Sequence, residues 1–146
     1  MLKDYLSQNV AYDMQMLNFT GQNIFVAPGM MLWAPNPLLL NALYESFSIH
    51  ARNMIDFLCG RRPPQFPERP VAQDYVPGFK YELDQHLLDH YASLHNQQLH
   101  LGQRRIAEGT GKLSPTEMFA VYNWVRAAFE AWLDALPAQY KVVQPA

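Results

Sequence analysis

Histidines are the residues of this sequence best suited to proton transfer or metal binding, and there are five of them. His86, His90, His95 and His100 fall within one stretch predicted to be helical, and His50 lies in an earlier one. An imidazole titrates near neutral pH and binds metals through either ring nitrogen. The spacing is therefore compatible with two kinds of site, a metal site and an acid–base site.

A metal site would combine His50 with His86 and His90, which are one helical turn apart. His90 falls on the leucine-rich face of its helix, His86 lies at the border of that face, and Glu82 is one turn earlier. The arrangement is similar to that of DinB-type bundles, in which one histidine of an early helix joins a later pair four residues apart. The sequence lacks the Glu-x-x-His motif of di-iron bundles. The alternative interpretation is one packed and one exposed histidine, without a metal.

The end of the same predicted helix carries a second pattern, His-Asn-Gln-Gln-Leu-His from His95 to His100, followed by Arg104 and Arg105. It resembles the motif of HEPN domains, small bacterial helical bundles. In that motif Arg, a polar residue, three variable residues and His form an RNA-cleaving site across a dimer. Asn96 matches the polar residue and His100 the histidine. His95 stands in place of the arginine, and an imidazole holds an anion less strongly than a guanidinium does.

A second partial match lies in the preceding predicted helix. Arg52 and Asn53 resemble the opening pair of the same motif, but Phe57 occupies the histidine position. One copy therefore lacks the arginine and the other lacks the histidine. The resemblance covers residues 37–105.

The resemblance implies a homodimer with RNA-binding or metal-independent endoribonuclease-like activity that uses no cofactor. In such a reaction a ribose 2′-hydroxyl attacks its own phosphate, with His100 as acid or base beside His95 and Asn96. Arg104, Arg105 or a residue of a second subunit would stabilise the phosphorane. The substrate-binding residues expected on this basis are Arg104, Arg105, His50, Arg52 and Asn53. A polar helix end without catalysis is the alternative.

Four predicted helices would position these groups. Their ranges are about Lys3–Thr20 with Gly21 as a stop, Pro37–Gly60 with Asn36 as N-cap, Tyr81–Leu101, and a fourth helix that opens with a Ser114–Glu117 capping box. Prolines make the stretch from Arg61 to Gly78 a long irregular crossover. Almost nothing matches the alternating pattern of a strand. The sequence predicts an all-α four-helix bundle, built around the second helix, as a single domain over residues 1–146.

Each predicted helix has an apolar face. The expected core residues are Leu6, Val10, Met14 and Leu17 in the first; Leu39, Leu40, Leu43, Tyr44, Phe47, Ala51, Met54, Ile55 and Leu58 in the second; Leu83, Leu87, Tyr91, Leu94 and Leu101 in the third; and Met118, Val121, Tyr122, Val125, Phe129, Trp132 and Leu136 in the fourth. His50 falls inside the apolar arc of the second helix. Glu45, Arg52 and Asp56 lie within about 40° of one another and predict a solvent-exposed strip.

Composition narrows the class of protein. The chain has 146 residues, 49% of them hydrophobic, and a net charge of −2, which suits one globular domain. This charge argues against coating of nucleic acid by bulk charge and is compatible with a local basic patch. The single cysteine, Cys59, and the absence of a signal-like start predict a cytoplasmic protein. The uncharged run from Met14 to Tyr44 contains Pro28 and Pro35, so it predicts a buried segment and no membrane span.

A non-catalytic interaction module is another hypothesis. The apolar connector from Ile24 to Pro35 and the Pro-rich crossover would bind another protein, because exposed aromatic and methionine side chains are typical of interfaces. Met30, Met31 and Trp33 are the residues that suggest it.

Overall fold

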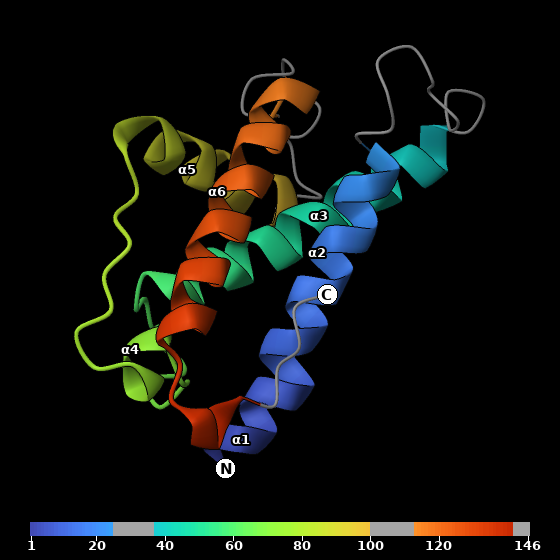
Figure 1. Cartoon of the computed structure of the whole chain (residues 1–146). Helices are drawn as coiled ribbons and strands as arrows, with labels where there is room; N and C mark the ends of the chain where they lie inside the picture. Colours follow the sequence, from blue (N-terminus) through green and yellow to red (C-terminus); the bar gives the residue numbers. More distant parts are fainter. Residues whose placement is uncertain (25–36, 100–112, 142–146) are drawn as a thin grey trace.

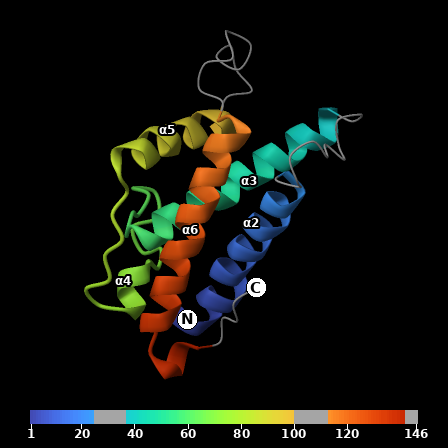
Figure 2. The same ribbon diagram turned by 45° about the horizontal axis from the view of Figure 1, so that its top comes forward.

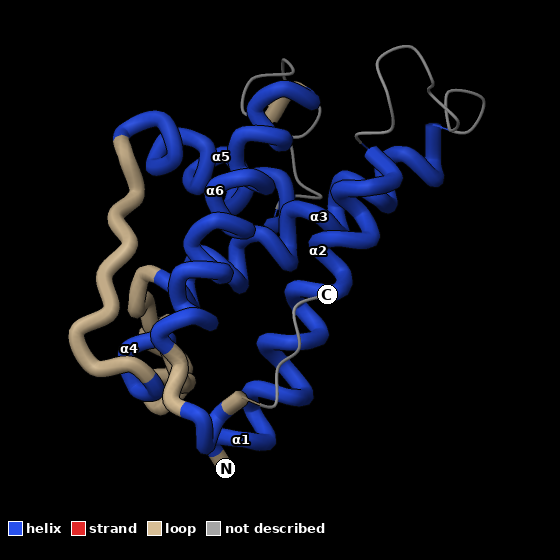
Figure 3. Tube along the Cα trace, viewed as in Figure 1, coloured by secondary structure: helices blue, strands red, loops and turns tan. Residues whose placement is uncertain are grey.

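A computed structural model describes residues 1–24, 37–99 and 113–141, and all regular structure within these ranges is helical (Figure 3). In chain order the elements are α1 (Leu2–Tyr5), the π-helical η1 (Leu6–Val10), α2 (Ala11–Ile24), α3 (Pro37–Leu58), α4 (Ala72–Tyr75), α5 (Gln85–Leu99), α6 (Pro115–Ala135) and the 3₁₀ turn η3 (Ala138–Tyr140). The predicted all-α class is confirmed. No helix among these residues is long and apolar enough to cross a membrane.

The helix α3 is the element that the other long helices share. It contacts α2, α5 and α6, and also the short helix α4. Figures 1 and 2 show α6 crossing α3, with α2 beside α6 and α5 on the other flank. The central position predicted for the second helix is thus confirmed.

The N-terminal helical segment continues past the predicted stop at Gly21 and runs to Ile24. The expectation that Gly21 ends the helix is wrong, because the glycine serves packing between helices. A Cβ at Gly21 would lie 3.1 Å from Cε2 of Tyr122 on α6. The hydroxyl of Tyr122 donates a 3.0 Å hydrogen bond to Asn18 Oδ1 and fixes the ring against α2.

Apart from Gly21, the helix termini follow the sequence signals with one exception. The helix α3 ends before Gly60, whose φ of 71° is the left-handed conformation expected after a helix, while the predicted N-cap Asn36 lies outside the described residues. The Ser114–Glu117 capping box of α6 is confirmed. The start of α5 is the exception, since it begins at Gln85. The Asp84 carboxylate accepts a 2.9 Å hydrogen bond from the Leu87 N–H, so Asp84 sets the start of α5 and the predicted start at Tyr81 is wrong.

The core joins all the long helices and the crossover. The predicted core residues of the first and fourth helices are all buried, as are most of those in α3, although Leu39 is exposed. Trp132 is fully buried in the last turn of α6, and its indole N–H donates a 3.2 Å hydrogen bond to the carbonyl of Ala72. Tyr75 donates to the Leu2 carbonyl at 2.9 Å. The helix α4 therefore anchors the otherwise irregular crossover to α1 near the N-terminus and to the end of α6.

Candidate functional site

The histidine of α3 is bound to a carboxylate of α2. His50 Nδ1 lies 2.6 Å from Asp13 Oδ1, and Asn53 Nδ2 donates to the same oxygen at 3.1 Å. Both His50 and Asp13 are buried, and the ring of Tyr12 meets the imidazole edge-on at 5.5 Å. A carboxylate only accepts hydrogen bonds, so Nδ1 donates to Asp13 and Nε2 is the ring nitrogen left for another partner. The arrangement can orient His50 as a proton acceptor through Nε2.

The predicted burial of His50 is confirmed, but its partner Asp13 is not among the predicted core or site residues. Asp13 stands within the apolar face of its helix, next to Met14 and one turn before Leu17. A carboxylate in a buried stripe requires a hydrogen-bond donor, and this was the signal available in the sequence.

A second polar cluster lies where α5 packs on α3. Asp56 is only 5% exposed, and its Oδ1 accepts a 2.6 Å hydrogen bond from the hydroxyl of Tyr91. Arg52 Nε is 3.8 Å from Asp56 Oδ2, and the guanidinium of Arg61 lies 4.5 Å from the centre of the Tyr91 ring. Burial, and then the hydrogen bond to Asp56, raise the pKa of Tyr91. The prediction of a solvent-exposed strip is wrong for Asp56, because α5 covers it.

Arg52 and Asn53 are neighbours in the sequence but face different helices. Asn53 binds Asp13 on α2, whereas Arg52 lies beside Asp56 and Tyr91 at α5. Successive residues of an α-helix point about 100° apart, so the pair cannot converge on one small group. Of the two predicted motif residues, Arg52 belongs to the α3–α5 contact and Asn53 to the α2–α3 contact.

The helices α3 and α5 run in opposite directions. Near the end of α3, the Cys59 thiol lies 3.6 Å from the carbonyl of Tyr81, which precedes α5, and further back Asp56 pairs with Tyr91. One turn before Asp56 is Arg52, and one turn after Tyr91 is His95. The α5 turn that carries His95 and Asn96 is thus at the level of the α3 turn that carries Arg52.

The remaining residues of the predicted phosphate site, His100, Arg104 and Arg105, lie outside the described residues, as does the apolar connector with Met30, Met31 and Trp33. The structure therefore adds the partners of Arg52 to this site and leaves the roles of His100, Arg104 and Arg105 as predictions.

The three histidines of the predicted metal site do not come together. His86 and His90 are neighbours on α5, with ring centres 6.0 Å apart, but His50 faces α2 and is bound to Asp13. Within the described ranges, no three His, Cys, Asp or Glu side chains are grouped so that they could hold a metal ion. The predicted convergence is wrong because α5 approaches α3 on the flank of Asp56, away from His50.

The single thiol is unsuited to nucleophilic chemistry. Burial raises the pKa of Cys59 to about 11, against a partial lowering by Arg61. The thiolate is the nucleophilic form, and it is scarce at neutral pH when the pKa is this high.

Comparison with known proteins adds no assignment, since no known protein family, curated protein or solved structure matches the chain.

Proposed function

We propose that this protein is a HEPN-like bundle that binds single-stranded RNA and cleaves it without a metal, at the contact between α3 and α5. The supporting observation is the place of Arg52. The α3 copy of the motif has the arginine but no histidine, and the α5 copy has His95, Asn96 and His100 but no arginine. Antiparallel packing brings the α5 turn of His95 and Asn96 to the level of the α3 turn of Arg52. We infer that His100 joins these residues, so that the two incomplete copies together supply one complete set of groups.

Charge at this contact favours a phosphate. In the cluster of Arg52, Arg61, Asp56 and Tyr91, one guanidinium lies beside the carboxylate and the other lies over the Tyr91 ring. The hydrogen bond from Tyr91 and the nearby charge of Arg52 hold Asp56 in place. A guanidinium fixed before the substrate arrives stabilises developing negative charge on a phosphorane with little reorganisation.

In the proposed reaction the 2′-oxygen of one nucleotide bonds to the adjacent phosphorus, and the bond from phosphorus to the 5′-oxygen breaks. The 2′-hydroxyl proton goes to a base and the 5′-oxygen receives a proton from an acid, with His100 in one of these two roles. Arg52, assisted by Arg104 or Arg105, stabilises the phosphorane. The products are a 2′,3′-cyclic phosphate and a 5′-hydroxyl end.

The test uses the full chain, a labelled single-stranded RNA and excess chelator. We expect cleavage to 2′,3′-cyclic phosphate ends, loss of cleavage in His100→Ala, and a decrease of about a hundredfold in Arg52→Gln. Arg126→Gln, which removes a half-exposed arginine of α6, is the matched control and is expected to cleave normally. RNA degradation that persists unchanged in His100→Ala would falsify the catalytic proposal. If the protein binds RNA through Arg52 but does not cleave it, only the RNA-binding part of the proposal stands.

A second candidate function, dimerisation through an apolar face, is supported by exposed side chains on α2 and α3. Tyr12 and Phe19 lie on one side of α2, and Leu38 and Ile49 lie on one side of α3. Tyr12 packs against His50, so the two rows border the same helix contact. Their exposed area is roughly 450 Å², at about 200 Å² for each complete large apolar side chain. That is about half of what one partner of a standard interface buries.

A second copy of the chain is the partner that this face favours. The described stretches from Met14 to Ile24 and from Pro37 to Tyr44 contain no charged residue, so two such faces meet without repulsion between like charges. We expect a dimer in analytical ultracentrifugation, and a monomer for Phe19→Lys combined with Ile49→Lys. Phe66→Ser, which changes an exposed ring elsewhere, is the control. If the double variant sediments with the same particle mass in solution as the wild type, the dimer proposal is contradicted.

A further inference from the structure

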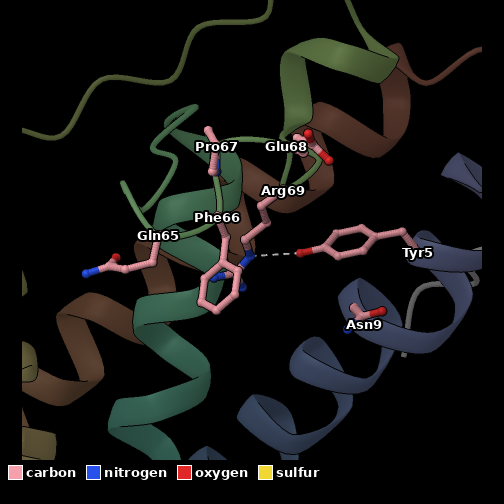
Figure 4. Close-up of a pocket in the computed structure, with 7 residues that line it drawn as sticks. All are labelled: Tyr5, Asn9, Gln65, Phe66, Pro67, Glu68 and Arg69. Atoms are coloured by element: carbon pink, nitrogen blue, oxygen red, sulfur yellow. Dashed lines mark hydrogen bonds between the residues drawn. The ribbon is translucent and has the colours of Figure 1, made fainter.

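A pocket of about 600 Å³ separates the N-terminal helical segment from the Pro-rich crossover. Figure 4 shows it in close-up. Tyr5 and Asn9 line it from α1 and η1, and residues 65–69 line it from the crossover. In Figure 4 the side chain of Arg69 reaches the hydroxyl of Tyr5, and the ring of Phe66 lies on the same side of the loop as Arg69. The pocket is large enough for a small organic ligand.

The crossover side of the pocket is fixed by hydrogen bonds. The Phe66 N–H donates to the Pro63 carbonyl at 2.9 Å, and the Arg69 N–H donates to the Phe66 carbonyl at 3.1 Å. Arg62 then donates through Nε to the Arg69 carbonyl at 3.0 Å and binds both carboxylate oxygens of Asp74 at 2.7 Å. Two consecutive turns and an anchored arginine therefore hold this loop in one conformation before any ligand binds.

Phe66 is 67% exposed on this ordered loop. Burial of an aromatic ring is favourable, so a ring held in solvent by a fixed backbone gains free energy when a flat ligand covers it. Aromatic side chains presented in this way are typical stacking platforms for the bases of single-stranded nucleic acids.

Arg69 supplies a positive charge beside the ring. Its Nε donates a 2.9 Å hydrogen bond to the hydroxyl of Tyr5, which fixes the direction of the guanidinium. The two terminal nitrogens have no partner within the described part of the chain and remain able to bind an anion. Glu68 on the rim is acidic and opposes a highly charged anion, whereas the amide of Asn9 can donate to or accept from the edge of a base.

We propose that this pocket binds one nucleotide unit, with the base stacked on Phe66 and its single phosphate bound by Arg69. The nucleotide is either free or part of an RNA strand, and the second case rests on the proposed RNA function. Figures 1 and 2 place α1 and α4 at the end of the molecule opposite α5. On a bound strand, the pocket thus holds a nucleotide distant from the cleaved bond and increases affinity for long RNA.

The test measures binding of 5′-AMP and of ribose 5-phosphate to the full chain by NMR titration, and binding of a labelled uncleavable RNA by anisotropy. Phe66→Leu keeps an apolar side chain but removes the ring, and we expect it to weaken 5′-AMP binding about tenfold without affecting ribose 5-phosphate. Arg69→Gln is expected to weaken the binding of both 5′-AMP and ribose 5-phosphate, because each carries a phosphate. Phe119→Leu, which changes an exposed ring on α6, is the matched control and should change the binding of neither small molecule.

If Phe66→Leu weakens the binding of 5′-AMP but not of RNA, the ligand is a free nucleotide. If it weakens the binding of both, the ligand is a nucleotide of an RNA strand. The pocket proposal is overturned when Phe66→Leu binds both 5′-AMP and RNA as the wild type does, or when the wild type binds neither. It survives if the wild type fails to cleave RNA, because 5′-AMP binding does not depend on His100. Failure of the pocket and failure of the cleavage site are therefore separate results.

Discussion

Replacing Asp13 by alanine tests the buried link between α2 and α3. The change removes the acceptor of His50 Nδ1 and Asn53 Nδ2, which lie 2.6 and 3.1 Å from Asp13 Oδ1. The side chains of Asp13 and His50 are 12% and 11% exposed, so little water is available to replace the carboxylate. Each buried donor left without a partner costs about 1–3 kcal/mol. Two donors lose their acceptor, so the expected loss in the free energy of unfolding for Asp13→Ala is about 2–6 kcal/mol.

Urea unfolding followed by circular dichroism at pH 7 gives this free energy. Asp134→Ala changes an exposed carboxylate of α6 and is expected to stay within about 0.5 kcal/mol of the wild type. In a His50→Leu background, Asp13→Ala should cost less, because only Asn53 then loses its acceptor, and the coupling should be about 0.5–3 kcal/mol. Equal costs in the two backgrounds, or an Asp13→Ala variant as stable as Asp134→Ala, would refute the assignment of Asp13 as the shared acceptor.

Three further predictions concern packing and titration. Gly21→Ala should lower stability by about 1 kcal/mol in urea unfolding, since overpacking against the Tyr122 ring outweighs the gain in helix propensity, and Tyr122→Leu in the same chain should reverse the sign. At pH 8, iodoacetamide should label Cys59 about a hundredfold more slowly in the native than in the unfolded chain, because the folded thiol has a pKa of about 11; equal rates would contradict its burial. Burial tends to raise the pKa of Asp74, but hydrogen bonds from Arg62 and the Val71 N–H outweigh it and lower the pKa. Its contribution to stability is therefore complete above the ordinary aspartate pKa of about 4 and is lost as the pH falls below it, so acid unfolding of Asp74→Asn should show a weaker dependence on pH in that range.

Local signals explain which parts of the fold could be predicted from sequence. The buried stripe and the capping box of α6 depend on spacing within one helix, and both are confirmed. The left-handed Gly60 after α3 is likewise a local signal. Gly21 has the same residue type but a different role, because the ring of Tyr122 packs against it from a helix about a hundred residues later. A pattern within one helix cannot distinguish a glycine that ends the helix from one that admits a neighbour.

The polar clusters could be predicted only in part, for the same physical reason. The wheel of α3 puts His50 in the apolar arc, and the structure buries it, but its partner Asp13 is 37 residues away. The wheel also puts Asp56 on the polar side, where a lone helix would expose it. Tyr91 of α5 covers that side and makes Asp56 a buried acceptor. Burial of a charged residue depends on which other helix packs against it, and the residue spacing within one helix does not contain this information.

The divergence of Arg52 and Asn53 limits how a linear motif can work on a helix. Two adjacent helical residues point about 100° apart, so a phosphate bound by Arg52 lies away from Asn53, which is already engaged by Asp13. A site that needs a cation, a polar group and a histidine must therefore draw them from more than one helix. The proposed site draws them from Arg52 of α3 and the last turns of α5, whereas Asn53 and His50 join α2 to α3 through Asp13. Loss of Arg52 should therefore affect RNA, whereas loss of Asn53 should affect stability with little effect on RNA.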